Sequence, residues 1–156
     1  MKRAPIAGAV LSALAFGATP LFAQSAGTIV GKWSIEYERG RRMENGTVTS
    51  IMGTGTLIIA QQGDSLVATL EAPPRPDGTP TPPATIGGKI TGTGAVFLQK
   101  QRIRIQLNDE VQTPEITITW TLQANGDALS GTLARPLPNA TEQQDPTPVK
   151  GTRVKS

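Results

Sequence analysis

Five arginines lie in or beside the segments that connect the expected strands, and they are the side chains best suited to binding chemistry. They are Arg39, Arg41, Arg42, Arg75 and Arg135. If the fold brings these connections to one end, the guanidinium groups would bind a carboxylate or phosphate through paired hydrogen bonds. The alternative is ordinary surface charge. Its ion-pair partners would be Glu44, Asp77, Glu142 and Asp145.

The composition excludes several kinds of catalysis. The chain has no histidine and no cysteine, which excludes a Ser-His-Asp triad, Cys-His catalysis and ordinary zinc sites. The Gly-Thr repeats "GTGTL" and "TGTGAV" lack the lysine that follows in a P-loop, so they are interpreted as strand and turn glycines. We therefore expect no catalytic residue, no metal and no cofactor. Carboxylate- or tyrosine-based catalysis stays open as a third function.

The carboxylates have structural interpretations. Glu36 and Glu38 share one face of an expected strand, since residues i and i+2 point the same way. The apolar residues between them are expected to face inward, so both acids are expected to face solvent. Asp64 and Asp127 follow glycines in short turns, where aspartate bonds to the nearby backbone.

The first residues predict a secretory signal peptide. Lys2 and Arg3 precede an apolar stretch over 6–16, and cleavage is expected after Ala23, with Ala26 as a second candidate. The alternative, a membrane anchor or first helix, fits less well because the apolar stretch is short for spanning a membrane. We expect a signal peptide over 1–23 and one domain over 24–156. Without cysteine, a bacterial periplasm or extracellular space is the expected location.

Cleavage changes the charge argument. It removes Lys2 and Arg3, which lowers the 15 basic residues to 13 against 12 acidic ones. The mature chain is then near neutral, so we expect no nucleic-acid partner. No integral membrane segment is expected after cleavage, and the oligomeric state is left open. About 133 mature residues suit a single domain.

Alternating apolar and polar residues predict strands along the whole mature chain. The expected strands cover 32–39, 50–61, 64–72, 85–91, 94–107, 115–124, 128–134 and 149–155. The second and fifth look long enough to contain a bulge or break, near Gly53 and Gly55 and near Lys100-Gln101. The stretches "GDSLVATL" and "GDALSGTL" repeat one hairpin at an offset of 63 residues.

The connections predict how these strands are arranged. Short turns alternate with long connections along the chain, so an up-and-down meander puts every tight turn at one end. The expected fold is all-β: an eight-stranded antiparallel up-and-down barrel, closed at one end and open at the end with the long loops. Closure also removes exposed strand edges.

The first strand begins Gly31-Lys32-Trp33, and Arg153 lies in the last strand. This pairing resembles the calycins, the group of lipocalins and avidins, in which lipocalins start with a similar Gly-x-Trp and pack a late arginine over that tryptophan. The resemblance implies contact between Trp33 and Arg153 at the closed end. The repeated "GD-x-L" hairpins are similar to those of small secreted bacterial proteins. Departures from the lipocalins are the missing disulfides and the missing long helix.

The expected function is non-catalytic binding at or inside the open end, with a small apolar or amphiphilic ligand. The ligand-lining candidates are Trp33, Ile35, Tyr37, Phe97, Ile118 and Trp120, and further inner-face candidates are Leu57, Ile59, Leu66, Leu70, Ile105, Leu122 and Leu133. In this hypothesis an anionic head would lie at the arginines and the tail inside. The alternative is a protein-interaction or inhibitor-like module that uses the proline- and arginine-rich loops, with a filled barrel.

Overall fold

The computed structural model describes residues 29–92, 94–107, 109–138 and 144–155. The predicted signal peptide over 1–23 lies outside these residues. The described chain forms one closed antiparallel barrel in the order β1-β10-β9-β8-β5-β4-β3-β2, so the expected eight-stranded meander is confirmed. The barrel strands are β1 (Gly31–Glu44), β2 (Thr47–Gln62), β3 (Ser65–Glu71), β4 (Ala84–Thr91), β5 (Gly94–Arg102), β8 (Glu115–Asn125), β9 (Ala128–Ala134) and β10 (Thr147–Arg153).

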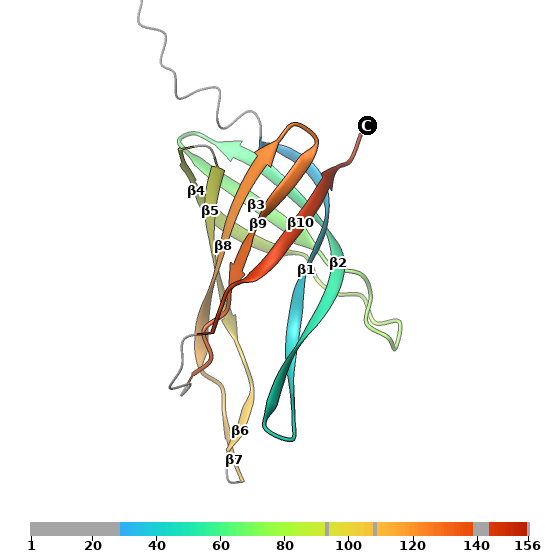
Figure 1. The fold of residues 1–156 in the computed structure, drawn as a ribbon, viewed down its shortest axis with the longest axis vertical. Coiled ribbons are helices and arrows are strands. Elements are labelled where there is room, and N and C mark those ends of the chain that lie inside the picture. Colours follow the sequence, from blue (N-terminus) through green and yellow to red (C-terminus); the bar gives the residue numbers. More distant parts are fainter. Residues whose placement is uncertain (1–28, 93, 108, 139–143, 156) are drawn as a thin grey trace, which may run out of the picture.

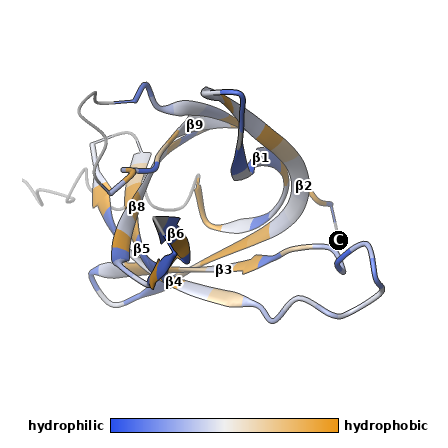
Figure 2. Cartoon of the chain, turned by 90° about the horizontal axis from the view of Figure 1, so that it is seen from below, coloured by the Kyte–Doolittle hydropathy of each residue, from blue (hydrophilic) through white to orange (hydrophobic). Residues whose placement is uncertain are grey.

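Alternation along each strand fills the barrel interior. On β8, the side chains of Ile116, Ile118, Trp120 and Leu122 are buried and the residues between them are more exposed. Strands from all sides contribute to a single buried cluster, which includes Phe97 of β5. Period-two burial is the expected pattern for a sheet with one apolar face, and closure turns that face inward. Figure 2, seen from the end with the long connections, shows the strands as a ring.

The tight turns lie together at one end of the barrel, next to the C-terminus (Figure 1). The β2–β3 and β8–β9 turns place Gly63 and Gly126 at φ values of 58° and 61°, a left-handed conformation that favours glycine. These two turns are the repeated "GD" hairpins of the sequence. The repeat therefore reflects a shared turn chemistry at the closed end.

The connection between the first two strands is shorter than the expected strand bounds of 32–39 and 50–61 imply. β1 and β2 continue past the barrel as a two-stranded arm that ends in a turn at Asn45 and Gly46, with φ values of 51° and 77° (Figure 1). Two consecutive residues with positive φ form the type I′ hairpin turn, which matches strand twist. The arm projects from the open end of the barrel.

The fifth expected strand, over 94–107, is also corrected. β5 ends at Arg102, and the chain then forms a separate small hairpin of β6 (Ile105–Leu107) and β7 (Glu110–Gln112) beyond the open end. Ile105, expected on the inner face of the barrel, therefore lies in this hairpin and is only half-buried. The break falls at residues 103–104, beyond the expected position at Lys100-Gln101.

The closed end is built on Trp33, and the expected contact with Arg153 is present. The two residues are register partners in β1 and β10, and the guanidinium carbon of Arg153 lies 4.2 Å from the Trp33 ring centroid. The indole Nε1 of Trp33 donates to the carbonyl of Ile29 over 2.9 Å, and Arg153 donates to the carbonyl of Val30 over 2.9 Å. Asp127 of the β8–β9 turn lies 3.5 Å from Arg153 Nε.

Candidate functional site

A pocket of about 200 Å³ lies at the open end of the barrel. Five barrel strands and the ends of two long connections contribute to its walls. Its lining residues are Tyr37, Arg39, Leu70, Ala72, Thr81, Pro82, Ala84, Gln99, Gln101, Trp120 and Arg135. Polar groups and apolar walls are both present, an arrangement typical of small-molecule sites.

Two aromatic rings form the inner surface of this pocket. Tyr37 and Trp120 are buried, with ring centroids 5.4 Å apart and planes inclined at 44°. Tilted ring pairs at this distance are favourable. The indole Nε1 of Trp120 donates to the side-chain oxygen of Gln99 over 3.1 Å. That bond fixes the orientation of the Gln99 amide, whose nitrogen has no acceptor among the described residues.

Two arginines bring positive charge to the pocket. Arg39 lines it from β1, and Arg135, the first residue after β9, lines it from the start of the β9–β10 connection. Arg39 forms no ion pair within the described part of the chain, and its stem lies over Gly53 of β2, where a β-carbon would overlap it. The absence of a side chain at Gly53 therefore leaves the space that Arg39 occupies.

Behind the pocket lies a buried carboxylate, Glu38, which is fully shielded from solvent. Its Oε1 accepts a hydrogen bond from Arg41 Nε over 2.9 Å and lies 3.6 Å from Arg135 Nε. Its Oε2 accepts a hydrogen bond from the Ser50 hydroxyl over 2.7 Å. Buried charges need such pairing, because desolvation alone is costly.

The burial of Glu38 overturns the expectation that it faces solvent beside Glu36. The pairing of β1 with β2 shifts register between Glu38 and Gly40, which is the signature of a β-bulge. Tyr37 and Glu38 are consequently both buried, although they are adjacent and alternation would separate them. Glu36 is exposed, as expected. The only sequence signal was Gly40, since strand glycines often mark bulges.

The arginines around Glu38 outnumber it. Arg41 and Arg135 share one carboxylate, and Arg39 lines the pocket beside them with no ion pair of its own among the described residues. Arg41 Nη1 and Arg135 Nε are buried without a hydrogen-bond acceptor among the described residues. Burial lowers the pKa of Arg135; the charge of Glu38 raises it, and that of Arg41 lowers it further. The cluster therefore has an excess of positive charge and unused donors beside the pocket.

Of the five arginines singled out from the sequence, only two line the pocket. Arg41 turns to Glu38, while Arg42 is exposed on the arm and pairs with Glu44 over 3.3 Å. Arg75 is exposed in the β3–β4 connection, where its backbone makes a turn with Gly78 and Thr79. That connection swings to the side of the barrel (Figure 1).

The six ligand-lining candidates divide in a similar way. Tyr37 and Trp120 line the pocket. Trp33, Ile35, Phe97 and Ile118 are buried in the core cluster and are not among the lining residues of the pocket. Gln99, Gln101 and Arg39 supply the polar part of the site. The two glutamines were missed because they look like ordinary polar residues in the middle of the expected strand over 94–107, and Gln101 was considered only as part of a possible break.

The single tyrosine of the chain gives a direct probe of the pocket. Burial raises the pKa of Tyr37 above its ordinary value of 10.0, and the charges of Arg39 and Arg135 partly oppose the rise. We expect the phenolate absorbance of the folded protein to titrate with a midpoint above 10.0, and that of the urea-unfolded chain at about 10.

The same shift makes stability depend on pH. Below pH 10 the tyrosine is protonated in both states, so its contribution to stability is fully present. Above pH 10 the unfolded chain loses its proton first, so this contribution is lost as the pH rises through the folded-state pKa. Equal midpoints for the folded and unfolded chain would contradict the buried position of the phenol.

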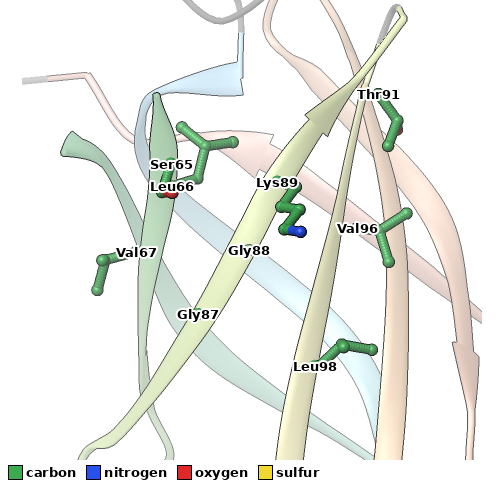
Figure 3. Close-up of a pocket in the computed structure, with 9 residues that line it drawn as sticks. All are labelled: Ser65, Leu66, Val67, Gly87, Gly88, Lys89, Thr91, Val96 and Leu98. Atoms are coloured by element: carbon green, nitrogen blue, oxygen red, sulfur yellow. The ribbon is translucent and has the colours of Figure 1, made fainter. Parts of the chain in front are cut away.

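A second hollow lies on the outer face of the barrel, over β3, β4 and β5. It measures about 600 Å³ and is bordered by Val67, Val96 and Leu98 (Figure 3). Gly87 lies at its floor, as the register partner of both Val67 and Leu98. A missing side chain in one cross-strand row is what makes this face concave.

The neighbouring glycines of β4 allow a matched test. A β-carbon at Gly87 meets nothing within 4 Å, whereas one at Gly88 would overlap the Phe97 ring. We expect Gly87→Val to raise the free energy of unfolding by about 0.5–1 kcal/mol, through strand propensity and loss of chain entropy. Gly88→Val is expected to lower it by about 1–3 kcal/mol through overpacking. Urea unfolding measures both changes. Equal effects of the two substitutions would contradict the assignment of Gly87 to the outer face of the barrel and Gly88 to the inner face.

Metal-binding groups and membrane-spanning helices were considered among the residues that the structure describes. These residues include no group of three or more acidic side chains that could hold a metal ion. They also include no helix that is long and apolar enough to cross a membrane.

No protein-family model matches the chain, and comparisons with curated proteins and with solved structures found no significant match.

Proposed function

We propose that this chain is a non-catalytic binding protein that holds a small carboxylate-bearing ligand in the pocket at the open end of its barrel. One observation carries the proposal: Arg39 and Arg135 line the same small pocket as the Tyr37–Trp120 ring pair. Cations beside an aromatic surface recognise a ligand that combines an anionic head with a flat or apolar body.

In this proposal, the head of such a ligand binds to the two guanidinium groups that line the pocket. Arg39 has no carboxylate partner within the described chain, and Arg135 shares Glu38 with Arg41. A ligand carboxylate would accept hydrogen bonds from both, and hydrogen bonds between ionised partners are the stronger kind. The protonated Tyr37 hydroxyl and the Gln99 amide are further donors at neutral pH.

The body of the ligand is limited by size. The pocket, at about 200 Å³, is smaller than typical drug-sized sites, and Leu70, Pro82 and Ala84 form its apolar wall. The inner-face side chains beyond the aromatic pair are buried against one another. A short aliphatic or aromatic acid therefore suits the site better than a long-chain amphiphile whose tail enters the barrel.

The location of the protein and its resemblance to a fold family are also part of the proposal. The expected signal peptide and the lack of cysteine support export to a bacterial periplasm or extracellular space. The Trp33–Arg153 contact supports the lipocalin- or avidin-like resemblance, because that pairing is what the resemblance implies. We therefore propose an exported, calycin-like barrel that binds its ligand at the open end.

Calorimetric titration with benzoate, butyrate and inorganic phosphate tests the proposal, with the neutral benzamide as the matched probe for the head group. We expect a carboxylate to bind and benzamide to bind at least about tenfold more weakly, since a charged hydrogen bond contributes about 1.5–3 kcal/mol. Binding of phosphate without binding of a carboxylate would assign phosphate esters, rather than carboxylates, as the ligands of the site. The proposal would be overturned if benzoate, butyrate and phosphate all failed to bind.

The chain supplies its own control variants. Arg39→Gln should weaken carboxylate binding at least about tenfold, because it removes one charged donor from an exposed side chain that lines the pocket. Arg42→Gln and Arg75→Gln remove the same charge outside the pocket and should leave binding unchanged. Equal losses in all three variants would indicate a general charge effect rather than a site.

A further inference from the structure

The arm that projects from the barrel has an open backbone edge along β2. β2 pairs with β1 from Thr47 to Ile59, but it pairs with β3 only from Thr56 onward. Over 47–55, β2 thus has a neighbour on one side only within the described part of the chain. Alternate backbone N–H and C=O groups on such an edge are ready to pair with another extended chain.

This edge lacks the features that normally prevent strand pairing. Between Thr47 and Ala60, β2 contains no charged residue and no proline. Val48, Ile51 and Met52 are 37%, 45% and 42% exposed on the arm. Natural edge strands usually carry charges, prolines or bulges, and a long apolar edge without them is a site of association.

The opposite edge of the same arm is a built-in comparison. β1 pairs with β10 only up to Glu36, so its outer part is also unpaired within the described residues. That part carries the register shift near Gly40 and the charged residues Arg39, Arg42 and Glu44. One edge of the arm is therefore protected against pairing, and the other is not.

We propose that two copies of this chain pair through the open edge of β2, antiparallel about a two-fold axis near Ile51. An antiparallel edge pair between identical chains is self-complementary, so each Ile51 would lie opposite its counterpart. The uncharged segment offers no ion pair to a charged peptide, but it meets a second copy without repulsion. The near balance of 13 basic and 12 acidic residues in the predicted mature chain adds no strong repulsion between copies.

Sedimentation velocity on the protein exported from a bacterial host tests this dimer over a range of concentrations. The shared edge is one strand wide, so we expect a weak dimer, with a dissociation constant of roughly 1–100 µM. Ile51→Lys should raise that constant at least about tenfold, since like charges directly opposite across paired strands repel. A monomer at about 500 µM would overturn the proposal.

Two controls separate this edge from other surfaces. Leu98→Lys places the same charge at a residue that is 55% exposed on the outer face of the barrel, and it should leave the dimer intact. An equimolar mixture of Ile51→Lys and Ile51→Glu should restore the dimer through opposite charges. A dimer that Ile51→Lys leaves unchanged would show pairing through another surface and overturn the proposal. None of the three variants changes a lining residue of the pocket at the open end, so carboxylate binding is tested independently.

Discussion

Replacing Glu38 with glutamine is expected to lower the free energy of unfolding by about 3–5 kcal/mol, the usual cost of leaving a buried charge without its partner. The substitution keeps the shape of the side chain and removes its charge. Arg41 Nε at 2.9 Å and Arg135 Nε at 3.6 Å would then lose their only carboxylate within the described chain. Chemical denaturation with urea, followed by tryptophan fluorescence, measures the change.

Glu36 is the matched control for this substitution. It lies on the same strand two residues earlier and is exposed, so Glu36→Gln should change stability by no more than about 0.5 kcal/mol. A loss below about 1 kcal/mol for Glu38→Gln would contradict the claim that this carboxylate neutralises the buried arginines.

The same variant links stability to the proposed function. Without the charge of Glu38, the cluster of Arg39, Arg41 and Arg135 attracts an anion more strongly. We therefore expect Glu38→Gln to bind benzoate more tightly than the unmodified protein does, and to gain more stability from it. Ligand that binds only the folded state stabilises it by mass action, so the urea midpoint should rise with benzoate concentration. Weaker benzoate binding by the variant would mean that Glu38 mainly positions the arginines.

The barrel could be predicted from the sequence because local signals and global closure agree. Alternation along strands such as β8 defines the inner face, and glycines such as Gly63 and Gly126 define the tight turns. Once short and long connections alternate, a meander places strand 1 beside the last strand. The contact of Trp33 with Arg153 is a direct consequence of that closure.

The arm could not be predicted in the same way, because it has no core to face. Residues such as Arg42, Glu44 and Thr49 give no period-two pattern, since both faces of the arm lie outside the barrel. The Asn45-Gly46 pair is a strong hairpin signal, but such signals are convincing mainly when apolar alternation flanks them. The expected loop was therefore an error of strand length rather than of topology.

The site depends on features that the sequence does not encode locally. A one-residue register shift buries Glu38, and nothing in the alternation around Tyr37 announces it. Gln99 becomes part of the pocket because β5 pairs with β8 and thereby meets Trp120. Of the arginines expected at the open end, Arg135 lines the pocket, whereas the β3–β4 connection carries Arg75 to the side of the barrel.

Removal of the Trp33 side chain should also produce a large loss of stability. We expect Trp33→Ala to lower the free energy of unfolding by about 3–5 kcal/mol, since it leaves a cavity in the closed end. The indole is fully buried, donates to the carbonyl of Ile29 and supports the guanidinium of Arg153. Urea unfolding measures the loss, and a value below about 1.5 kcal/mol would contradict a structural role at this end.

Two milder variants separate the ring from the charge above it. Arg153→Met keeps an apolar stem over the indole and removes the cation together with its hydrogen bond to Val30 and its ion pair with Asp127, so it should cost about 1–3 kcal/mol. Trp33→Phe keeps much of the burial and loses the bond to Ile29, and a double-mutant cycle with Arg153→Met measures how much the coupling of the cation to an indole exceeds its coupling to a phenyl ring. Because the predicted mature chain has only two tryptophans, Trp33→Phe also leaves Trp120 as its sole indole reporter, at the other end of the barrel. In this variant, a change of the Trp120 emission on addition of benzoate would report binding in the pocket. If benzoate changed the emission of the unmodified protein but not that of Trp33→Phe, the ligand would lie at the closed end.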